Sequence, residues 1–254
     1  MNMISEFPLF VFTTLAGLAA GASVVSAVFF TKEEEKRSWM LPLACLVLLG
    51  VGLLGCLGHL GRPLMFLNAL SNPSSMISQE AYWSIAFGAL LVVDVVLCFV
   101  KGACPRVVRV IEAIAAAGLV VVMGNAYFTG YGVEAWTNVV TWPLYLVGDL
   151  AMGAALASVF APSLCTKPAF AYLAIALDVI FAVVSVVEFT GFSGLGHDAM
   201  LFGVAAVLSI IGAAISFAGV KGKFSPMAAA AATAVVMILA VALARYCFYA
   251  ASIL

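Results

Sequence analysis

Residues 39–58 read WMLPLACLVLLGVGLLGCLG, a run of twenty residues without a single charge. A helix of about 20 apolar residues crosses the hydrocarbon core of a bilayer, which is roughly 30 Å thick. The chain turns polar on both sides of this run, with Lys36 and Arg37 before it and His59 and Arg62 after it. The run therefore predicts one membrane-spanning helix with polar connections at its two ends.

Seven further runs of similar length end at charged, polar, Gly or Pro residues. These runs must be helices, because lipid does not satisfy unpaired backbone groups and the short alternation of a membrane barrel is absent. The sequence predicts an all-α polytopic membrane protein, a single domain over residues 1–254 built as a bundle of eight transmembrane helices. The expected spans are residues 8–30, 39–58, 81–100, 106–128, 142–162, 168–190, 198–219 and 227–250.

The composition supports a lipid environment and excludes other classes. Of the 254 residues, 65% are hydrophobic and 9% are charged, against about 25% charged in soluble domains. A net charge of −1 argues against nucleic acid as a partner. The six cysteines include no C-x-x-C pair, so this protein is expected to bind no metal, and any redox cluster belongs to a partner. Residues 1–6 carry an acid and no basic segment, which favours a retained first span over a cleaved signal.

Basic residues predict the orientation in the membrane. Nine of the eleven Lys and Arg residues fall in or beside the connections after spans one, three, five and seven. Because cytoplasmic connections are enriched in these residues, both termini are expected on the outer side of the cytoplasmic membrane. Arg62 and Arg245 fall on the outward side and become candidates for a specific role. Gly17 with Gly21, and the glycines at 52, 55 and 58, predict close helix contacts.

The outward connection between spans two and three concentrates unlike functional groups. His59 ends the second span, Arg62 follows it, Glu80 precedes the third span, and residues 64–70 are mostly apolar. This pattern predicts an apolar cleft with a few polar groups, at the depth of a lipid-soluble head group. Quinol oxidation suits such a cleft: His59 accepts a proton, Glu80 orients it, and Arg62 balances charge. Alternatively, His59 caps a helix at the interface and Arg62 extends to lipid phosphate.

Other polar residues leave two interpretations open. Arg245 beside Tyr249 is either an interfacial Arg in an aromatic belt, extending to the surface, or part of the wall of a quinol site. Acids inside the spans either form a proton path or hydrogen-bond the helices together. They are Asp94, Glu112, Asp149, Asp178 and Glu188. A proton-coupled or ion transporter is therefore the alternative function, although no inverted repeat or broken span supports it.

Several sequence blocks resemble the membrane anchor subunits of dimethyl sulfoxide reductase, the DmsC-type anchors. Residues 6–13, EFPLFVFT, are similar to the opening E-[WF]-P-L-x-x-F-T of that family. The likeness continues at His59-Leu60-Gly61-x-Pro63, with Asn68, Leu70, Ser78 and Glu80, and returns at Arg245 with Phe248 and Tyr249. The order of these blocks and the number of spans also agree with the family.

The resemblance implies a membrane anchor that oxidises menaquinol, a role related to that of NrfD/PsrC-type quinol-interacting anchors. It implies electron transfer to a ferredoxin-like iron–sulfur subunit, which feeds a molybdopterin catalytic subunit in anaerobic respiration. It places the quinol chemistry on His59 and Glu80 and leaves the terminal acceptor open. The expected menaquinol-binding residues are His59, Arg62, Pro63, Asn68, Glu80, Arg245 and Tyr249. No haem is expected, since His59 and His197 are the only histidines and both lie at the outward edge.

Overall fold

The computed structural model of the chain describes residues 6–30, 39–59, 67–68, 70–130 and 132–251, without the side chain of His59. The described residues form eight helices long and apolar enough to cross a membrane, which confirms the predicted fold class. The helices are α1 (Phe7–Phe29), α2 (Met40–His59), α3 (Met76–Lys101), α4 (Arg106–Phe128), α5 (Thr141–Phe160), α6 (Pro168–Gly194), α7 (Met200–Val220) and α8 (Pro226–Ala250). Two short 3₁₀ helices, η3 (Glu134–Trp136) and η4 (Pro162–Thr166), lie in the connections.

Most helix boundaries fall within two residues of the predicted spans, and those of α4 coincide with them. Two helices are longer than expected: α3 begins five residues earlier, at Met76, and α6 continues to Gly194. Hydropathy marks only the apolar part of a helix, whereas backbone hydrogen bonds continue through polar residues. Glu80 consequently lies inside α3, one turn after its start, rather than in the preceding connection.

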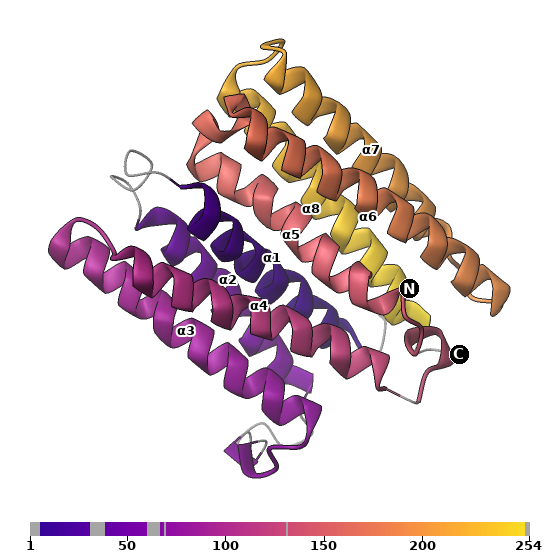
Figure 1. Ribbon diagram of the computed structural model, residues 1–254. Helices are drawn as coiled ribbons and strands as arrows, with labels where there is room; N and C mark the ends of the chain where they lie inside the picture. The colour runs from indigo at the N-terminus through magenta and orange to yellow at the C-terminus, as the bar shows by residue number, and fades with distance from the viewer. Residues whose placement is uncertain (1–5, 31–38, 60–66, 69, 131, 252–254) are drawn as a thin grey trace.

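The eight helices form two groups of four (Figure 1). In the first group α1 packs against α2 and α4, and α3 completes the ring by packing against the same two helices. In the second group α5 packs against α6 and α8, and α7 completes the ring. Contacts of α5 with α1 and α4, together with those of α8 with α1, join the two groups.

The start of α1 and the end of α8 lie at the same end of the bundle, called here the terminal end (Figure 1). Because successive helices run in opposite directions, the connections α2–α3, α4–α5 and α6–α7 also lie there. The opposite end carries the α3–α4 connection, where Gly102 terminates α3 with a φ of 75°. The placement of the terminal end on the outer face of the membrane stays a prediction of the charge pattern.

Helix α1 contacts α2, α4, α5 and α8, and small residues let it approach α5 closely. The positions where Cβ atoms would stand on Gly17 and Gly21 are occupied by side-chain and backbone atoms of Asp149, and Gly153 meets the Gly21 backbone. Gly52 and Gly55 similarly face α1, which confirms their predicted role in close contacts. The prediction was wrong for Gly58, because no described atom lies within 4 Å of a Cβ built there.

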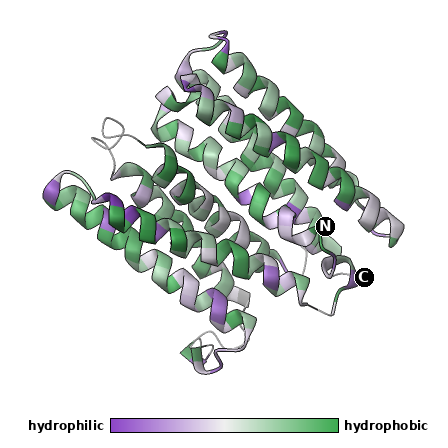
Figure 2. Ribbon diagram, in the orientation of Figure 1, coloured by the Kyte–Doolittle hydropathy of each residue, from purple (hydrophilic) through white to green (hydrophobic). Residues whose placement is uncertain are grey.

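Large apolar side chains cover the outside of the bundle. Val100, Val107 and Val235 are about 70% exposed, and hydrophobic colour predominates along the helices that face the viewer (Figure 2). The interior is instead rich in Ala and Gly, with aromatic rings towards the terminal end. An apolar exterior over small buried residues is typical of helices packed in lipid, and the chain is a multi-pass membrane protein.

Candidate functional site

A cavity of about 280 Å³ lies near the terminal end of the first four-helix group, among α1, α2, α3 and the α2–α3 connection. We call it the terminal-end cavity. Its lining residues are Phe12, Leu53, Cys56, Leu57, Leu67, Leu70, Ile77, Glu80, Ala81, Ser84 and Ile85. This volume is close to the lower end of the range for small-molecule sites, roughly 300–1,000 Å³.

Helix α3 supplies the polar groups of the terminal-end cavity. Ile77, Glu80, Ala81, Ser84 and Ile85 follow a spacing of three and four residues, so they share one face of the helix. The Glu80 Oε1 atom and the Ser84 Oγ atom are buried and have no hydrogen-bond partner among the described residues. This mostly apolar cavity therefore contains one carboxyl oxygen and one hydroxyl whose hydrogen-bonding capacity no described residue uses.

A hydrogen bond joins the described part of the α2–α3 connection to α3, and another lies within that part. Tyr82 donates from its hydroxyl to the Leu70 carbonyl oxygen, at 2.5 Å. Ser71 donates to the Asn68 carbonyl oxygen, at 2.6 Å. The bond from Tyr82 holds Leu70 beside the cavity, and both Leu67 and Leu70 are lining residues.

The structure describes some of the site residues predicted in this connection and not others. His59 is the last residue of α2 and follows Cys56, a lining residue, by three positions, so its backbone lies at this end of the cavity. The side chain of His59 lies outside the described part of the protein, as do Arg62 and Pro63. Asn68 is exposed and is not a lining residue, whereas its neighbour Leu67 is.

Arg245 lies inside the bundle, where it is fully buried. It donates hydrogen bonds to the Thr13 carbonyl oxygen and to an Asp149 carboxylate oxygen, with which it forms an ion pair. Its guanidinium carbon lies 4.5 Å from the centre of the Tyr145 ring. The interpretation of Arg245 as an interfacial residue extending to the surface was therefore wrong, because a buried carboxylate provides the charge that lipid phosphate was expected to supply.

Tyr249 belongs to the same buried network. Its hydroxyl oxygen lies 2.9 Å from the Tyr145 hydroxyl and 3.1 Å from the Thr13 hydroxyl. Neither Arg245 nor Tyr249 lines the terminal-end cavity, but Phe12, which does, precedes Thr13 in α1. The two features therefore share helix α1, and a direct contact of Arg245 or Tyr249 with a ligand stays a prediction.

The five acids inside the spans are all buried, with exposed fractions of 4% or less, as the interior-facing prediction required. Asp149 pairs with Arg245, and Asp94 accepts a hydrogen bond from Arg109 Nε at 3.1 Å. Asp94 and Glu112 line one small cavity, and Asp178 lines another in the second four-helix group. Asp94 and Glu112 therefore share one place in the bundle, Asp149 and Asp178 lie elsewhere, and two of the five acids connect helices through ion pairs.

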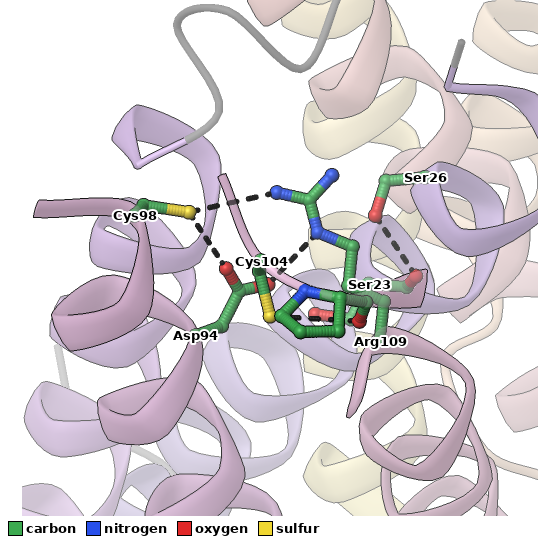
Figure 3. Close-up of polar contacts among 7 residues, drawn as sticks. Ser23, Ser26, Asp94, Cys98, Cys104 and Arg109 are labelled. Atoms are coloured by element: carbon green, nitrogen blue, oxygen red, sulfur yellow. Dashed lines mark hydrogen bonds and ion pairs between the residues drawn. The ribbon is translucent and has the colours of Figure 1, made fainter. Parts of the chain in front are cut away.

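Two cysteines near Asp94 also belong to this region (Figure 3). The Cys98 thiol donates to Asp94 at 3.0 Å. Cys104 lies in the α3–α4 connection, where burial, followed by the charge of Asp94, raises its pKa to about 12. Among the described residues, no three His, Cys, Asp or Glu side chains are grouped as a metal site requires.

Sequence reasoning missed several residues of these sites. Cys56 and Ser84 line the terminal-end cavity, and Thr13 and Tyr145 surround Arg245. Ser84 follows Glu80 by four positions, so the helical period could have placed it on the same face. The partners of Arg245 lie in other helices, and no local pattern indicates them.

Comparisons with known proteins show the family to which the protein belongs. The family model described as DMSO reductase anchor subunit (DmsC) matches residues 1–243. A similar protein is the C subunit of the anaerobic dimethyl sulfoxide reductase of Haemophilus influenzae, which is 32% identical over 167 residues. That match spans 59% of the present sequence and 58% of the relative. The match of the family model over nearly the whole length shows that the protein belongs to the DMSO reductase anchor subunit (DmsC) family.

Proposed function

We propose that this protein is the quinol-oxidising membrane anchor of a DMSO reductase-type complex, and that the head group of menaquinol binds in the terminal-end cavity. The observation that carries the proposal is the buried Glu80 Oε1 atom, which has no hydrogen-bond partner among the described residues of an otherwise mostly apolar cavity. A menaquinol head group is an apolar ring with two hydroxyls, so it needs this combination of apolar surface and hydrogen-bond acceptors.

The surroundings of the cavity support entry of the ligand from the bilayer. Three of the lining residues, Leu67, Ile77 and Ile85, are between 57% and 62% exposed. Because the outside of the bundle is apolar, these exposed side chains face lipid. A lipid-soluble quinol then reaches Glu80 without crossing water, and its isoprenoid tail stays in the membrane.

Oxidation of the quinol removes two electrons and two protons, and the protein must receive the protons. In the proposed reaction, the Glu80 carboxylate accepts a hydrogen bond and then a proton from one hydroxyl. His59, one turn beyond Cys56 on α2, accepts the proton of the other hydroxyl. The two electrons pass to a ferredoxin-like iron–sulfur subunit and from there to a molybdopterin catalytic subunit, the partners that the family implies.

The proposal is tested by Glu80→Gln in the assembled complex. The amide keeps the size of the side chain but does not accept a proton, so quinol-dependent reduction of the terminal acceptor falls by about 10²-fold or more. Reduction with an artificial donor that feeds the catalytic subunit directly stays unchanged. Glu188→Gln is the matched control, because Glu188 is also buried but lies on α6 and is not a lining residue of the cavity.

Replacement of His59 by Gln extends the same test. We expect loss of quinol-dependent reduction with normal assembly of the complex, which is checked by co-purification of all subunits. Unchanged quinol turnover in Glu80→Gln contradicts the proposed cavity. Unchanged turnover in His59→Gln alone contradicts only the second proton acceptor.

A further inference from the structure

A second group of buried polar side chains lies towards the opposite end of the first four-helix group. Asp94 on α3 is 2% exposed and accepts hydrogen bonds from Arg109 Nε at 3.1 Å and from the Cys98 thiol at 3.0 Å (Figure 3). Arg109 and Glu112 project from the first two turns of α4. Ser23, from the last two turns of α1, belongs to the same group.

Glu112 is the member of this group whose bonding is incomplete. It is 4% exposed, and its Oε2 atom has no hydrogen-bond partner among the described residues. The described charged and polar side chains that act on it are Asp94, Arg109 and Ser23, together with the Cys45 thiol on α2. Three neighbouring helices therefore surround this carboxyl, in addition to its own.

A small cavity lies against this carboxyl. Its volume is about 10 Å³, and it is lined by Ser23, Ser26, Phe30, Leu41, Pro42, Asp94, Arg109 and Glu112. A cavity of roughly 10–15 Å³ holds one water molecule when polar groups surround it. The serine hydroxyls and the charged side chains supply these partners. Glu112, whose Oε2 atom has no described hydrogen-bond partner, therefore lines a space for one bound water.

The charges of the described side chains favour a neutral Glu112. Among the described residues, two carboxyl groups and one guanidinium group share this buried, membrane-embedded site, and Asp94 already accepts the hydrogen bond of Arg109 Nε. A second carboxylate would place a further negative charge beside the first in a medium of low polarity, which is costly. A protonated carboxylic acid avoids that cost and gains a hydroxyl donor for the neighbouring water.

We propose that Glu112 is a proton-binding site, a neutral carboxylic acid that exchanges its proton with water held in the adjacent cavity. The site shares no lining residue with the terminal-end cavity and lies nearer the opposite end of the bundle. It gives the protein a second place for proton exchange, separate from the proposed quinol chemistry. The two proposals can therefore be tested independently, and the failure of one does not contradict the other.

Infrared spectroscopy of the purified complex tests the protonation of Glu112. The difference spectrum between the unsubstituted protein and Glu112→Gln contains the C=O stretching band of a carboxylic acid, and this band shifts in D₂O as the proton exchanges. Glu80→Gln leaves the band in place. A difference spectrum with carboxylate bands instead overturns the proposal, as does a carboxylic acid band that does not shift in D₂O.

A chemical label tests the site without a substitution of Glu112. Dicyclohexylcarbodiimide, a membrane-soluble carbodiimide, adds to a protonated carboxylic acid. The acid proton goes to a carbodiimide nitrogen, the carboxyl oxygen bonds to the central carbon, and the O-acylurea rearranges to a stable N-acylurea with no leaving group. Mass spectrometry is expected to find this adduct on Glu112 in membranes containing the complex. An unmodified Glu112 overturns the proposal.

The Asp94→Asn variant tests the role of the neighbouring charges. The amide removes the negative charge beside Glu112 while Arg109 keeps its positive charge, so Glu112 ionises and its carbodiimide adduct is lost. Asp178→Asn is the matched control, since Asp178 is a buried acid in the second four-helix group, and the adduct on Glu112 persists there. Equal labelling in Asp94→Asn and Asp178→Asn contradicts the proposed electrostatics.

Discussion

Glu80 and Arg245 are both ionisable residues inside the bundle, but their surroundings differ. The Arg245 guanidinium has a carboxylate, a carbonyl oxygen and an aromatic ring around it. The Glu80 carboxyl has an oxygen atom without a described partner and lines a cavity. A buried charge that is held in an ion pair contributes to structure, whereas a cavity carboxyl with an oxygen atom that lacks a described partner is available to a ligand. This contrast places the proposed chemistry at Glu80.

The ion pair of Arg245 with Asp149 predicts a stability effect. Arg245→Met leaves the Asp149 carboxylate buried without its counter-charge, which destabilises the protein by about 3–5 kcal/mol. The double variant Arg245→Met with Asp149→Asn removes both charges and recovers a large part of that loss. Unfolding of the purified protein in detergent measures both effects. A single variant as stable as the unsubstituted protein contradicts the structural role of the pair.

Cys104 lies outside the membrane-spanning helices, and its raised pKa predicts how the alkylation rate of its thiol depends on pH. Burial raises its pKa from 9.0 to about 12, and only the thiolate reacts with alkylating agents. Because the thiolate fraction below the pKa grows tenfold per pH unit, the alkylation rate of Cys104 rises about tenfold for each unit from pH 8 to pH 11. Site-resolved mass spectrometry measures this rate. An alkylation rate that stops rising near pH 9 would show that Cys104 has the pKa of an ordinary thiol, which would contradict the prediction.

Some of these residues could be predicted from the sequence and others could not. Glu80 was expected at the site because a single acid follows the polar and apolar connection after His59. Arg245 was noticed because it breaks the orientation pattern of the basic residues. Its partner Asp149 lies 96 residues earlier in the sequence, and the phase of one helix relative to another is not encoded in a local pattern. That partner required the three-dimensional structure.

Helices α1 and α5 cross with their backbones in close contact. One added methyl group at this contact is therefore expected to lower the stability of the protein. Gly21→Ala forces a Cβ atom into the Asp149 backbone, and overpacking of this kind costs about 1–3 kcal/mol. Gly191→Ala on α6 is the matched control, because no described atom lies within 4 Å of its Cβ position. Unfolding in detergent distinguishes the two variants. Equal stabilities contradict the close contact of α1 with α5.

All eight helices could be predicted because each must present about 20 apolar residues to lipid, a requirement that local composition reveals. The start of α3 could not, since its first turn and a half carries Ser78, Gln79 and Glu80. This extension matters for the site, because it gives Glu80 a helical position on the same face as Ser84. The hydropathy pattern alone placed Glu80 in a connection, where the direction of its side chain cannot be predicted.

The division of the whole molecule into two four-helix groups was not visible in the sequence, which shows no clear internal repeat. It follows from which helices contact one another. The terminal-end cavity and the Glu112 site both belong to the first group, nearer its two different ends. The outward orientation of the terminal end is predicted from nine basic residues in or beside the connections at the other end, and it stays a prediction.

Photolabelling of the complex with an azido derivative of menaquinol tests the proposed quinol site most directly. We predict that the label attaches within residues 53–57, 67–70 and 77–85, and that excess menaquinol prevents attachment. An apolar groove between α6 and α7, lined by Val183, Val187, Val207 and Ile211 among others, provides the alternative surface. Saturable labelling in that groove, with none in the terminal-end cavity, would contradict the account.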